Sequence, residues 1–429
     1  MRDFLQAFIA FAAEKGFFRE CYLVGGAVRD ILLNRPTSDY DIAVRLNAKG
    51  RAQEFAEKIG GKCIVLDETF GTMRVTKDRA YIDICRMQGN SIIEDLGKRD
   101  ITINAMALPL GTLAAPAPAR HLVDPFNGSH DLQWKTIRMV SEQNLLNDPL
   151  RMLRVFRFAQ SLNFTPEVHT LNVIRQHGAR IAECAAERIA EELRHILREP
   201  TSYRTIKLIQ RDGFADHLFP ELAAATKTQK QKQLQAYGYL EHILNNLPLY
   251  FFEHAPKVAL YFTGPDCAVS MKLALLFPTL TAAESYAWRL KLSHREIEGI
   301  AMIEHYLADF SELMGAENED RLRFLHKVKD TLYSLIIYAI CQECICQMAD
   351  SPTLYHCREM LTLYHADYQE RLKLLPLLTG SDLISEFQLK PSPLFKKILD
   401  AVEMRVVEGS LNERHEAIDA AREMMLTAS

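Results

Sequence analysis

The stretch LVGGAVRD at residues 23–30 and the stretch SDYDIAV at residues 38–44 decide the fold of this chain. Each contains a short apolar run of the kind that forms a buried strand. The second run carries Asp39 and Asp41, and strand alternation places side chains two residues apart on one face. Two carboxylates beside a glycine turn supply the hard oxygen ligands that suit a magnesium ion and a triphosphate.

The glycine pair Gly25 and Gly26 fits a close approach of the backbone to phosphate groups. Glycine has no Cβ and tolerates positive φ, and the amides that follow begin a helix, whose N-terminus attracts anions. Arg29, one turn further on, adds a guanidinium that can bind phosphate. Glycine pairs and Asp-x-Asp pairs are common in turns and on solvated surfaces, but together, each beside an apolar run, they indicate a metal and phosphate site.

The composition is that of a globular protein with two or three domains, since 429 residues with 48% apolar content allow a sizeable core. No apolar run of about 20 residues is present, so no membrane span is expected. The N-terminus predicts an amphipathic helix over residues 4–13 and not a signal peptide. Nine cysteines without an export signal predict reduced thiols and a cytoplasmic location. A formal net charge of −4 neither predicts nor excludes an RNA partner.

The first third of the sequence predicts an α/β head, and the pattern from residue 147 onward is helical. The expected strands are residues 22–24, 40–44, 63–66, 72–76 and 80–85, with a helix over residues 28–33. In the hairpin that residues 77–79 would close, Asp83 faces away from Ile82 and Ile84. Asp83 is therefore either a third acid beside the Asp pair or a solvated strand residue. Helix breaks are expected near Pro200, Pro220, Pro248, Pro278 and Pro391, and Pro116 and Pro118 indicate a loop.

Residues 94–105 form a polar cluster just before an apolar segment. Arg99 could bind a phosphate, while Asp100 and Asn104, one helical turn apart, could hold a ribose or orient Arg99. The alternative is a capped helix start with an ion pair.

A second cluster begins at Asp148, which suits an N-cap because Pro149 would take the first helical position. The helix after it carries Arg151, Arg154 and Arg157 between apolar residues. Arginines in such surroundings are costly unless they meet anions or carboxylates, although a solvated basic stripe is the alternative. Asp148 and Arg151 together offer an acceptor and a donor fork that suit a base edge.

Two further segments carry weaker signals. Residues 187–194 predict a helix with internal ion pairs that braces the arginine helix. A zinc site is conceivable at Cys341, Cys344, Cys346, His356 and Cys357. The apolar run before these cysteines favours ordinary core positions instead.

These motifs together resemble the bacterial tRNA nucleotidyltransferases and poly(A) polymerases, the class II branch of the polymerase β superfamily. The matching stretches, over about the first 200 residues, are 24–30, 39–41, 95–105, 124–131, 148–158 and 187–193. The resemblance implies an α+β fold in which a small polymerase-β-like nucleotidyltransferase head with a mixed β-sheet precedes an all-α neck, body and tail. The implied parts are a catalytic head at 1–140, a base-recognition neck at 141–200, a body at 201–330 and an RNA-binding tail at 331–429.

The resemblance also implies roles for individual residues. Asp39 and Asp41 would hold Mg²⁺, with Asp83 in support. The nucleotide-binding residues would be Gly25, Gly26 and Arg29 at the triphosphate, Arg99 and Asn104 beside them, Asp148 and Arg151 at the base, and Arg154 and Arg157 in support. The implied reaction is attack of a tRNA 3′-hydroxyl on the α-phosphate of CTP or ATP, with release of pyrophosphate.

Three departures from the family pattern refine this expectation. Asn147 stands where relatives often carry Glu, but Asp148 is kept. Only residues 87–93 lie between Arg86 and Glu94, where relatives that add the terminal A usually carry a longer flexible loop. The short segment predicts an enzyme that adds CC, with full CCA addition as the alternative.

The third departure lies in residues 269–297, which look like a degenerate phosphohydrolase domain. Phe277 and Pro278 stand where a His-Asp pair would bind metal, and His242 would be a remnant ligand, so a helical scaffold without metal is expected.

A poly(A) polymerase would share every head motif but often has a basic terminal extension, which residues 421–429 lack. An inactive RNA-binding relative would have lost the carboxylates or the arginine helix. The oligomeric state is not predicted.

Overall fold

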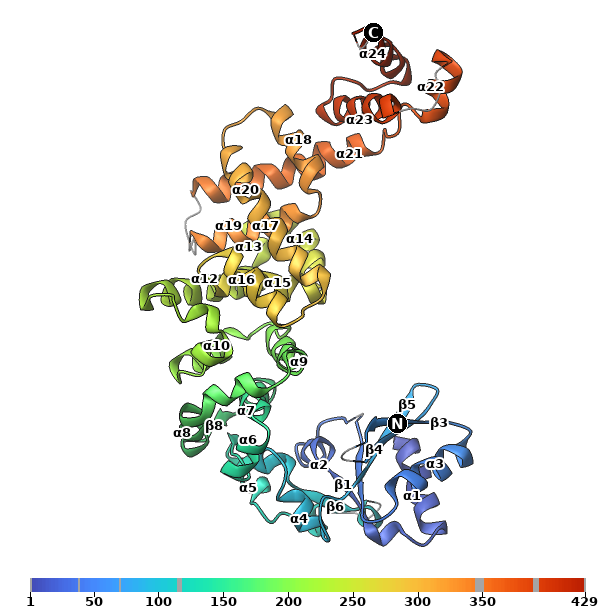
Figure 1. The fold of residues 1–429 in the computed structure, drawn as a ribbon, viewed down its shortest axis with the longest axis vertical. Coiled ribbons are helices and arrows are strands. Elements are labelled where there is room, and N and C mark those ends of the chain that lie inside the picture. The colour runs from blue at the N-terminus through green and yellow to red at the C-terminus, as the bar shows by residue number, and fades with distance from the viewer. Residues whose placement is uncertain are drawn as a thin grey trace. The chain divides into compact units, whose positions relative to one another are not determined.

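The computed structural model describes residues 2–37, 39–68, 71–113, 118–343, 351–388 and 393–427. The chain divides into two compact units, Met1–Ile196 with Arg204–Leu218 and Leu197–Tyr203 with Phe219–Ser429. In Figure 1, the large sheet lies in the blue N-terminal part of the chain, β8 (Thr165–Pro166) is labelled in the green part, and the yellow to red parts are helical. An α/β head followed by helices was predicted, and the prediction is confirmed.

A six-stranded mixed sheet with the order β3-β4-β5-β2-β1-β6 forms the centre of the head. The strands are β1 (Cys21–Val24), β2 (Asp41–Val44), β3 (Lys62–Asp67), β4 (Thr72–Lys77), β5 (Ala80–Arg86) and β6 (Ala107–Pro109). β2 pairs in parallel with β5, and the other neighbours are antiparallel. The predicted strands are all present, but β6 and a small parallel sheet of β7 (Thr136–Ile137) and β8 (Thr165–Pro166) were not predicted. These strands are too short to show a two-residue period.

The two faces of the large sheet differ in what covers them. On one face, α1 (Arg2–Glu14) and α3 (Ala48–Ile59) pack against the strands, and the rings of Phe8, Phe11 and Phe55 contact one another at centroid distances of 5.1 to 6.2 Å. On the other face, Val24, Ala43, Leu96 and Ala107 belong to a smaller buried cluster. Strand alternation places the carboxylates of β2 and β5 on this second face.

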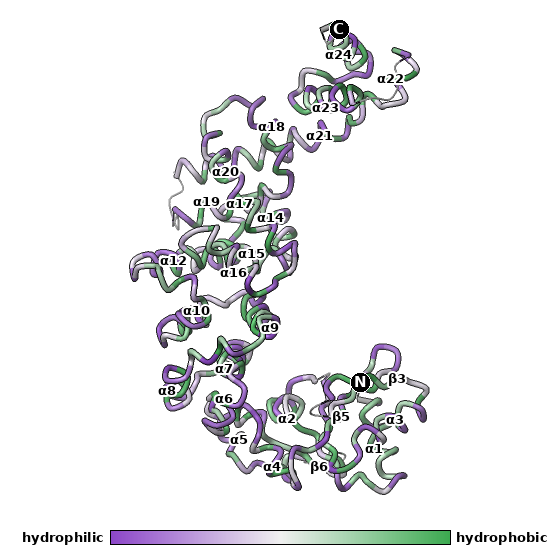
Figure 2. The backbone as a smooth tube through the Cα atoms, in the orientation of Figure 1, coloured by the Kyte–Doolittle hydropathy of each residue, from purple (hydrophilic) through white to green (hydrophobic). Residues whose placement is uncertain are grey.

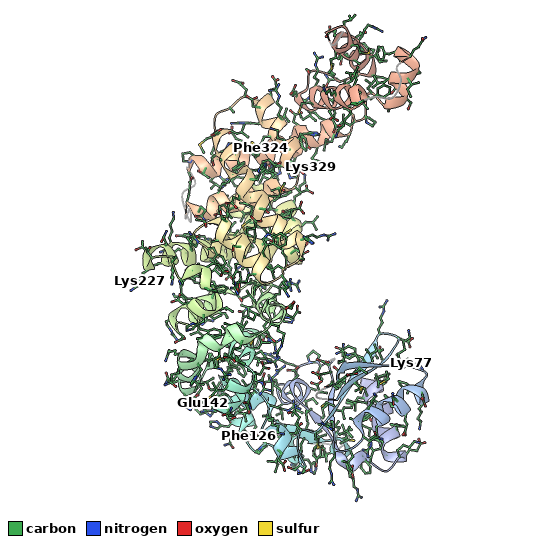
Figure 3. All side chains as sticks on the ribbon, in the orientation of Figure 1. Lys77, Phe126, Glu142, Lys227, Phe324 and Lys329 are labelled. Atoms are coloured by element: carbon green, nitrogen blue, oxygen red, sulfur yellow. The ribbon has the colours of Figure 1, made fainter. Side chains whose placement is uncertain are left out.

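The β4–β5 hairpin closes through a two-residue turn, since Lys77 pairs with Ala80. Asp78 takes a left-handed backbone conformation with φ of 54°, which Asp tolerates better than most residues. Lys77 lies near the tip of this hairpin (Figure 3). The predicted hairpin turn is confirmed.

Figure 2 shows hydrophilic and hydrophobic residues mixed along many of the helices, as expected for helices that bury one side. α19 (Thr331–Gln342) differs, because nearly all of its residues are buried. The remaining head and neck helices are α2 (Gly26–Leu32), α4 (Ile92–Leu96), α5 (Gly128–Gln133), α6 (Glu142–Asn147), α7 (Leu150–Leu162), α8 (Val168–His177), α9 (Ala186–Leu197), α10 (Tyr203–Arg211) and α11 (Ala215–Leu218). The second unit contains α12 (Lys227–Asn245), α13 (Leu247–Phe251), α14 (Ala255–Phe262), α15 (Pro265–Leu276), α16 (Leu280–Arg289), α17 (His294–Glu312), α18 (Asn318–Val328), α19 (Thr331–Gln342), α20 (Pro352–Leu363), α21 (Gln369–Leu372), α22 (Gly380–Phe387), α23 (Pro393–Glu408) and α24 (Arg414–Thr427). Among the described helices, none has the length and apolar content needed to cross a membrane.

The expected remnant of a phosphohydrolase site is an aromatic core. Phe277 is fully buried, and its ring centroid lies 5.9 Å from that of Phe219 and 5.0 Å from that of Tyr286. His242 contacts Asn246 on the same helix. Phe277 therefore contributes packing energy to the second unit.

The cysteine cluster shows no zinc ligand set among its described members. Cys341 and Cys357 are buried and form no disulfide, and His356 Nε2 lies 3.1 Å from the Phe310 carbonyl oxygen. Cys344 and Cys346 lie outside the described residues, as do Pro116 and Pro391. The core interpretation of Cys341 and Cys357 is confirmed.

Candidate functional site

Three carboxylates meet at one end of the sheet. Asp41 on β2 is the register partner of Asp83 on β5, and Asp39 precedes β2 by two residues. One oxygen of each carboxylate lies within 4.8 Å of the others, and in the described part of the chain this is the one group of acids, histidines or cysteines so arranged. Asp39 is exposed, Asp41 is half-buried and Asp83 is buried.

Burial and the neighbouring acids raise the pKa of Asp41 to about 6. Burial is the largest cause, and the charge of Asp39 adds to it, while Arg99 opposes both. A carboxylate that is costly to ionise among like charges is relieved by a cation. The donor set, three carboxylates in close reach, consists of the hard oxygens that Mg²⁺ prefers.

Arg74 on β4 completes a row of side chains across three strands. It is the register partner of Asp83, and its Nε and Nη2 donate to the two Asp83 oxygens at 2.8 Å and 2.7 Å. The guanidinium lies 4.1 Å from the centroid of the Tyr81 ring. Sequence reasoning missed Arg74, although alternation in the predicted strand places it on the same face as Asp83.

The glycine turn lies directly beside the carboxylates. Gly25 has φ of 70°, and a Cβ there would lie 3.2 Å from both Asp41 Oδ2 and Arg99 Nη1. Both the conformation and the close approach therefore require glycine. Gly26 begins α2, as the sequence predicted.

A pocket of about 480 Å³ extends from Asp41 to the arginine helix α7. Its basic lining residues are Arg86, Lys98, Arg99, Arg151, Arg154 and Arg188, and its acidic ones are Asp41, Asp95, Asp100 and Asp148. Six cations against four acids make this a suitable place for an anionic ligand. The pocket brings together the predicted residues Asp41, Arg99, Asp148, Arg151 and Arg154.

The short segment after β5 is held closed by two acids of α4. The backbone N–H of Gln88 donates to Asp95 Oδ1 at 2.8 Å, and that of Asn90 donates to Glu94 Oε2 at 3.1 Å. The other Asp95 oxygen accepts from Arg99 Nη2 at 3.2 Å. The segment is therefore connected to Arg99 through a single buried carboxylate.

Asp148 lies at the pocket, but the prediction that it caps the helix is wrong. The N-cap of α7 is Pro149, with no side-chain cap, because the Asp148 carboxylate is engaged elsewhere. It accepts from Arg188 Nη2 at 3.0 Å and lies 3.7 Å from Arg151 Nε. Arg151 Nη1 donates to the Lys98 carbonyl oxygen at 2.7 Å. Arg188 was assigned only a bracing role and is a lining residue that sequence reasoning missed.

The other two arginines of α7 meet carboxylates. Arg154 donates to Asp100 Oδ2 at 2.8 Å and lies 3.3 Å from Glu192, and Arg157 lies 2.8 Å from the other Glu192 oxygen. Burial raises the pKa of Asp100, but the charge and hydrogen bonds of Arg154 outweigh it and hold the pKa below its usual value. Glu192 lies on α9, so the predicted bracing of α7 by this helix has a physical basis.

The expected helical turn from Asp100 to Asn104 is wrong. Ile101 bridges to Met139 and a 3₁₀ turn covers Thr102–Asn104, so the two side chains point to different partners. Asp100 orients Arg154 and not Arg99, whereas Asn104 Oδ1 accepts from Arg29 Nη1 at 2.9 Å. Arg29, Asn104 and Arg157 are absent from the described lining of the pocket.

We expect Glu192→Gln to lower the stability of the first unit by about 2 kcal/mol, because Arg157 loses the carboxylate that it contacts and Arg154 loses one of its two carboxylate partners. That loss corresponds to a fall of roughly 4–8 °C in thermal midpoint for a unit of this size. Glu191→Gln on the same helix is the matched control, since the Glu191 side chain is 59% exposed and should change the midpoint by less than about 1 °C. Equal midpoints for the two variants would contradict the bracing role.

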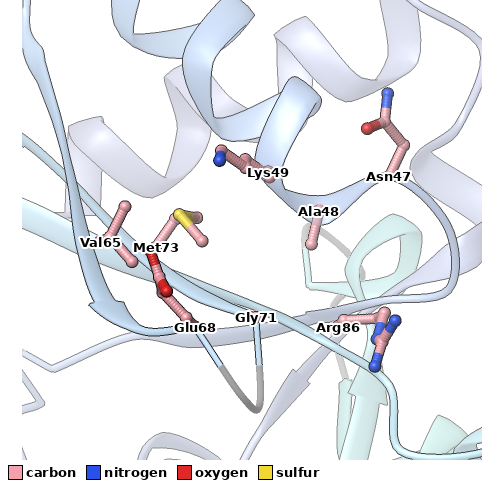
Figure 4. A pocket seen from close by; sticks show the side chains of 8 residues that line it. All are labelled: Asn47, Ala48, Lys49, Val65, Glu68, Gly71, Met73 and Arg86. Atoms are coloured by element: carbon pink, nitrogen blue, oxygen red, sulfur yellow. The ribbon is translucent and has the colours of Figure 1, made fainter.

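A second pocket, of about 510 Å³, lies beside the first. Figure 4 shows Asn47 and Lys49 at the start of α3 on one side and Val65 and Met73 on the other. Arg86 lines both pockets. This second pocket contains Glu68 but none of Asp39, Asp41 and Asp83, so we place the chemistry in the pocket that contains Asp41.

Comparison with known proteins gives matches along most of the chain. Residues 21–138 match the poly A polymerase head domain, residues 163–226 match a probable RNA and SrmB-binding site of polymerase A, and residues 280–421 match a putative tRNA nucleotidyltransferase domain 2. A CC-adding tRNA nucleotidyltransferase of Synechocystis is 30% identical over 94% of this chain and 93% of its own length. An A-adding tRNA nucleotidyltransferase of Deinococcus radiodurans is 29% identical over 92% and 93%. The Thermotoga maritima CCA-adding enzyme complexed with tRNA has the same fold, with a TM-score of 0.69 at 23% identity over 99% of this chain and 95% of that one.

Proposed function

Since this chain belongs to the tRNA nucleotidyltransferase family, we propose that it adds nucleotides from CTP, and ATP where the reaction extends to A, to the 3′ end of tRNA. The 3′-hydroxyl of the RNA attacks the α-phosphate, a P–O bond to the RNA forms, and the bond to the β-phosphate breaks to release pyrophosphate. The observation that carries the proposal is the basic pocket that extends from Asp41 to α7. In it, the phosphate end and the base end of one nucleotide have separate partners.

We assign roles to residues of the pocket, and to residues of the glycine turn and helices beside it, as follows. Gly25, Gly26 and Arg29 receive the triphosphate, and Arg99, held by Asp95, adds its charge beside the glycine turn. Asp148 and Arg151 receive the base. Arg154 and Arg157, with Asp100, Asn104 and Glu192, keep α7 and the glycine turn in position.

Asp39 and Asp41 would hold Mg²⁺, with Asp83 behind them. The raised pKa of Asp41 and the close approach of three carboxylates support this assignment. When bound, the ion supplies charge for the attacking and leaving oxygens of the transferred phosphoryl group.

The pKa of Asp41 gives a pH dependence with a defined sign. In the metal-free protein this carboxyl holds its proton up to about pH 6, against an ordinary pKa of 3.8. Its stabilising contribution is therefore complete below pH 3.8 and is lost as the pH rises through 6. Mg²⁺ needs the ionised form, so we expect MgCl₂ to raise the thermal midpoint at pH 7.5 and to have little effect at pH 5.

Thermal unfolding in EDTA and in MgCl₂ at both pH values measures this difference. Asp41→Asn should remove it, and in EDTA at pH 7.5 the variant should unfold at a higher temperature than the wild type. A midpoint gain from Mg²⁺ that is the same at pH 5 and pH 7.5 would count against the assignment.

Within the family, we propose that this chain adds the two cytidines only. The closed segment between β5 and α4 supports this, because Asp95 and Glu94 hold the backbone of Gln88 and Asn90 in place. The segment is too short to form a flexible loop that would change the shape of the pocket for ATP. The match to a CC-adding relative over 94% of the chain is consistent with it.

Incubation with tRNA lacking its 3′ end tests this choice. We expect growth by two C with CTP alone, no product with ATP alone, and no A when both are present, by sequencing of the products. A complete CCA end would refute the CC-only proposal and leave tRNA nucleotidyl transfer intact. A long A-tail on unrelated RNA would favour the poly(A) polymerase alternative, and no growth at all would favour the inactive relative. The four-part division at residues 140, 200 and 330 and the cytoplasmic location stay predictions.

A further inference from the structure

The carboxylate cluster contains a cation of its own, the Arg74 guanidinium. Arg74 and Asp83 are cross-strand partners in the antiparallel β4–β5 pair, where the ladder determines the separation of opposed side chains. Both Asp83 oxygens accept from Arg74, at 2.8 Å and 2.7 Å. Two parallel hydrogen bonds to one carboxylate are the strongest arrangement that Arg makes.

Burial and packing keep this pair together. The Asp83 side chain is 10% exposed and that of Arg74 is 34% exposed. The ring of Tyr81, on the strand that carries Asp83, lies against the guanidinium at 4.1 Å. Pulling Arg74 away would leave a buried carboxylate without its partner, which is strongly unfavourable.

The charges in the site follow from this pairing. Asp39, Asp41 and Asp83 carry three negative charges, and Arg74, which contacts Asp83 directly, carries one positive charge. Two negative charges remain, on Asp39 and Asp41, which match one divalent cation. Asp83 lies close enough to the other two acids to share a cation with them. Because Arg74 neutralises its charge, Asp83 attracts a second cation less strongly than a free carboxylate at that distance would.

We propose that Asp83 is the anchor of Arg74 and not a metal ligand, and that Arg74 is a positioning residue that limits the site to the divalent cation held by Asp39 and Asp41. This inference rests on the proposed magnesium site. It differs from an account in which a metal displaces Arg74 and takes all three carboxylates as ligands.

The affinity of the full-length protein for Mn²⁺, measured by electron paramagnetic resonance with Mn²⁺ as a probe for Mg²⁺, distinguishes the two accounts. The double variant Arg74→Met, Asp83→Asn removes the pair as a neutral unit, so its dissociation constant should stay within about threefold of the wild type. Arg74→Met alone frees a third carboxylate and should bind Mn²⁺ about tenfold more tightly. Asp39→Asn should weaken binding by about 30-fold or more.

Two controls separate positioning from folding. Arg74→Lys keeps the charge without the bidentate fork and should restore the wild-type affinity to within about threefold. Arg79→Met removes one charge from the exposed turn of the same hairpin and should leave the affinity unchanged. Thermal midpoints are recorded for every variant. If Arg74→Met is not folded at the assay temperature, Arg74→Gln is used in its place.

Two results of the Mn²⁺ measurement would contradict the inference, and they can be told apart. A double variant that binds Mn²⁺ as weakly as Asp39→Asn would overturn the inference, because Asp83 would then be a ligand, and the magnesium site would stand. Wild-type protein that binds no Mn²⁺ would overturn the proposed magnesium site and this inference with it.

Discussion

We expect Asp41→Asn to lower the rate of CTP incorporation by about 10³-fold or more, while tRNA binding should stay within about twofold of the wild type. The amide keeps the shape of the side chain but removes the charge that would hold the metal beside Gly25. Affinity for RNA comes from phosphate contacts spread over a large surface, so one carboxylate contributes little to it. Single-turnover incorporation and a filter-binding titration measure the two quantities.

Asp78→Asn is the matched control for this variant. Asp78 lies in the β4–β5 turn with φ of 54°, a conformation that Asn also adopts, so folding and incorporation should both be unchanged. Asp39→Asn should resemble Asp41→Asn. Near-normal CTP incorporation by Asp39→Asn or by Asp41→Asn would contradict the assignment of these carboxylates to the metal site.

We expect Asp148→Ala to lower the preference for CTP over UTP by about 10- to 100-fold, the value of one good base-edge contact. Cytosine presents an amino donor beside a ring acceptor, and a carboxylate with a guanidinium matches that pattern. Uracil presents the reverse pattern, an acceptor beside a ring donor, and is rejected. Asp148 is held for this role by Arg188 at 3.0 Å. The ratio of kcat/KM for CTP and UTP on tRNA lacking its 3′ end measures the preference.

Glu142→Ala provides a comparison on the neighbouring helix. Glu142 begins α6 and pairs with His177 at 3.3 Å, and its position is labelled in Figure 3. Its loss should leave the ratio of the two substrates unchanged. An unaltered ratio in Asp148→Ala as well would mean that the base is read by other residues. Adenine shares the amino-beside-acceptor pattern of cytosine, so this pair cannot by itself separate CTP from ATP.

Local patterns were sufficient for much of the head. The strand around Asp41, the hairpin at Asp78 and the glycine turn at Gly25 each follow from residues within a few positions of one another. Alternation along β5 placed Asp83 on the side away from Ile82 and Ile84. The two-residue strands β7 and β8 could not be predicted, because a pair that short has no period.

Side chains with several possible partners were predicted less well. Asp148 had the sequence of a helix cap, but Arg188, 40 residues away, engages its carboxylate instead. Orienting Arg99 was one role expected of Asp100, yet Asp100 pairs with Arg154, which lies 54 residues further along the chain. Asn104 accepts a hydrogen bond from Arg29, which lies 75 residues before it. Local spacing does not identify such partners, because the competition is between charges brought close by folding.

The sequence by itself determined the kind of site: an Asp-x-Asp pair and a glycine turn beside strands, and an arginine helix after them, since strand and helix periods act over a few residues. Only the tertiary structure decided how the charges are shared. It brought Arg74 to Asp83 across a hairpin, gave Glu192 to two arginines, and joined Arg99 to the short segment through Asp95. The two Glu192 ion pairs join separate helices and so depend on packing. The Arg74–Asp83 pair depends on the register of the hairpin. Arg99 and Asp95 lie only four residues apart, and folding adds the contact of Asp95 with the Gln88 backbone.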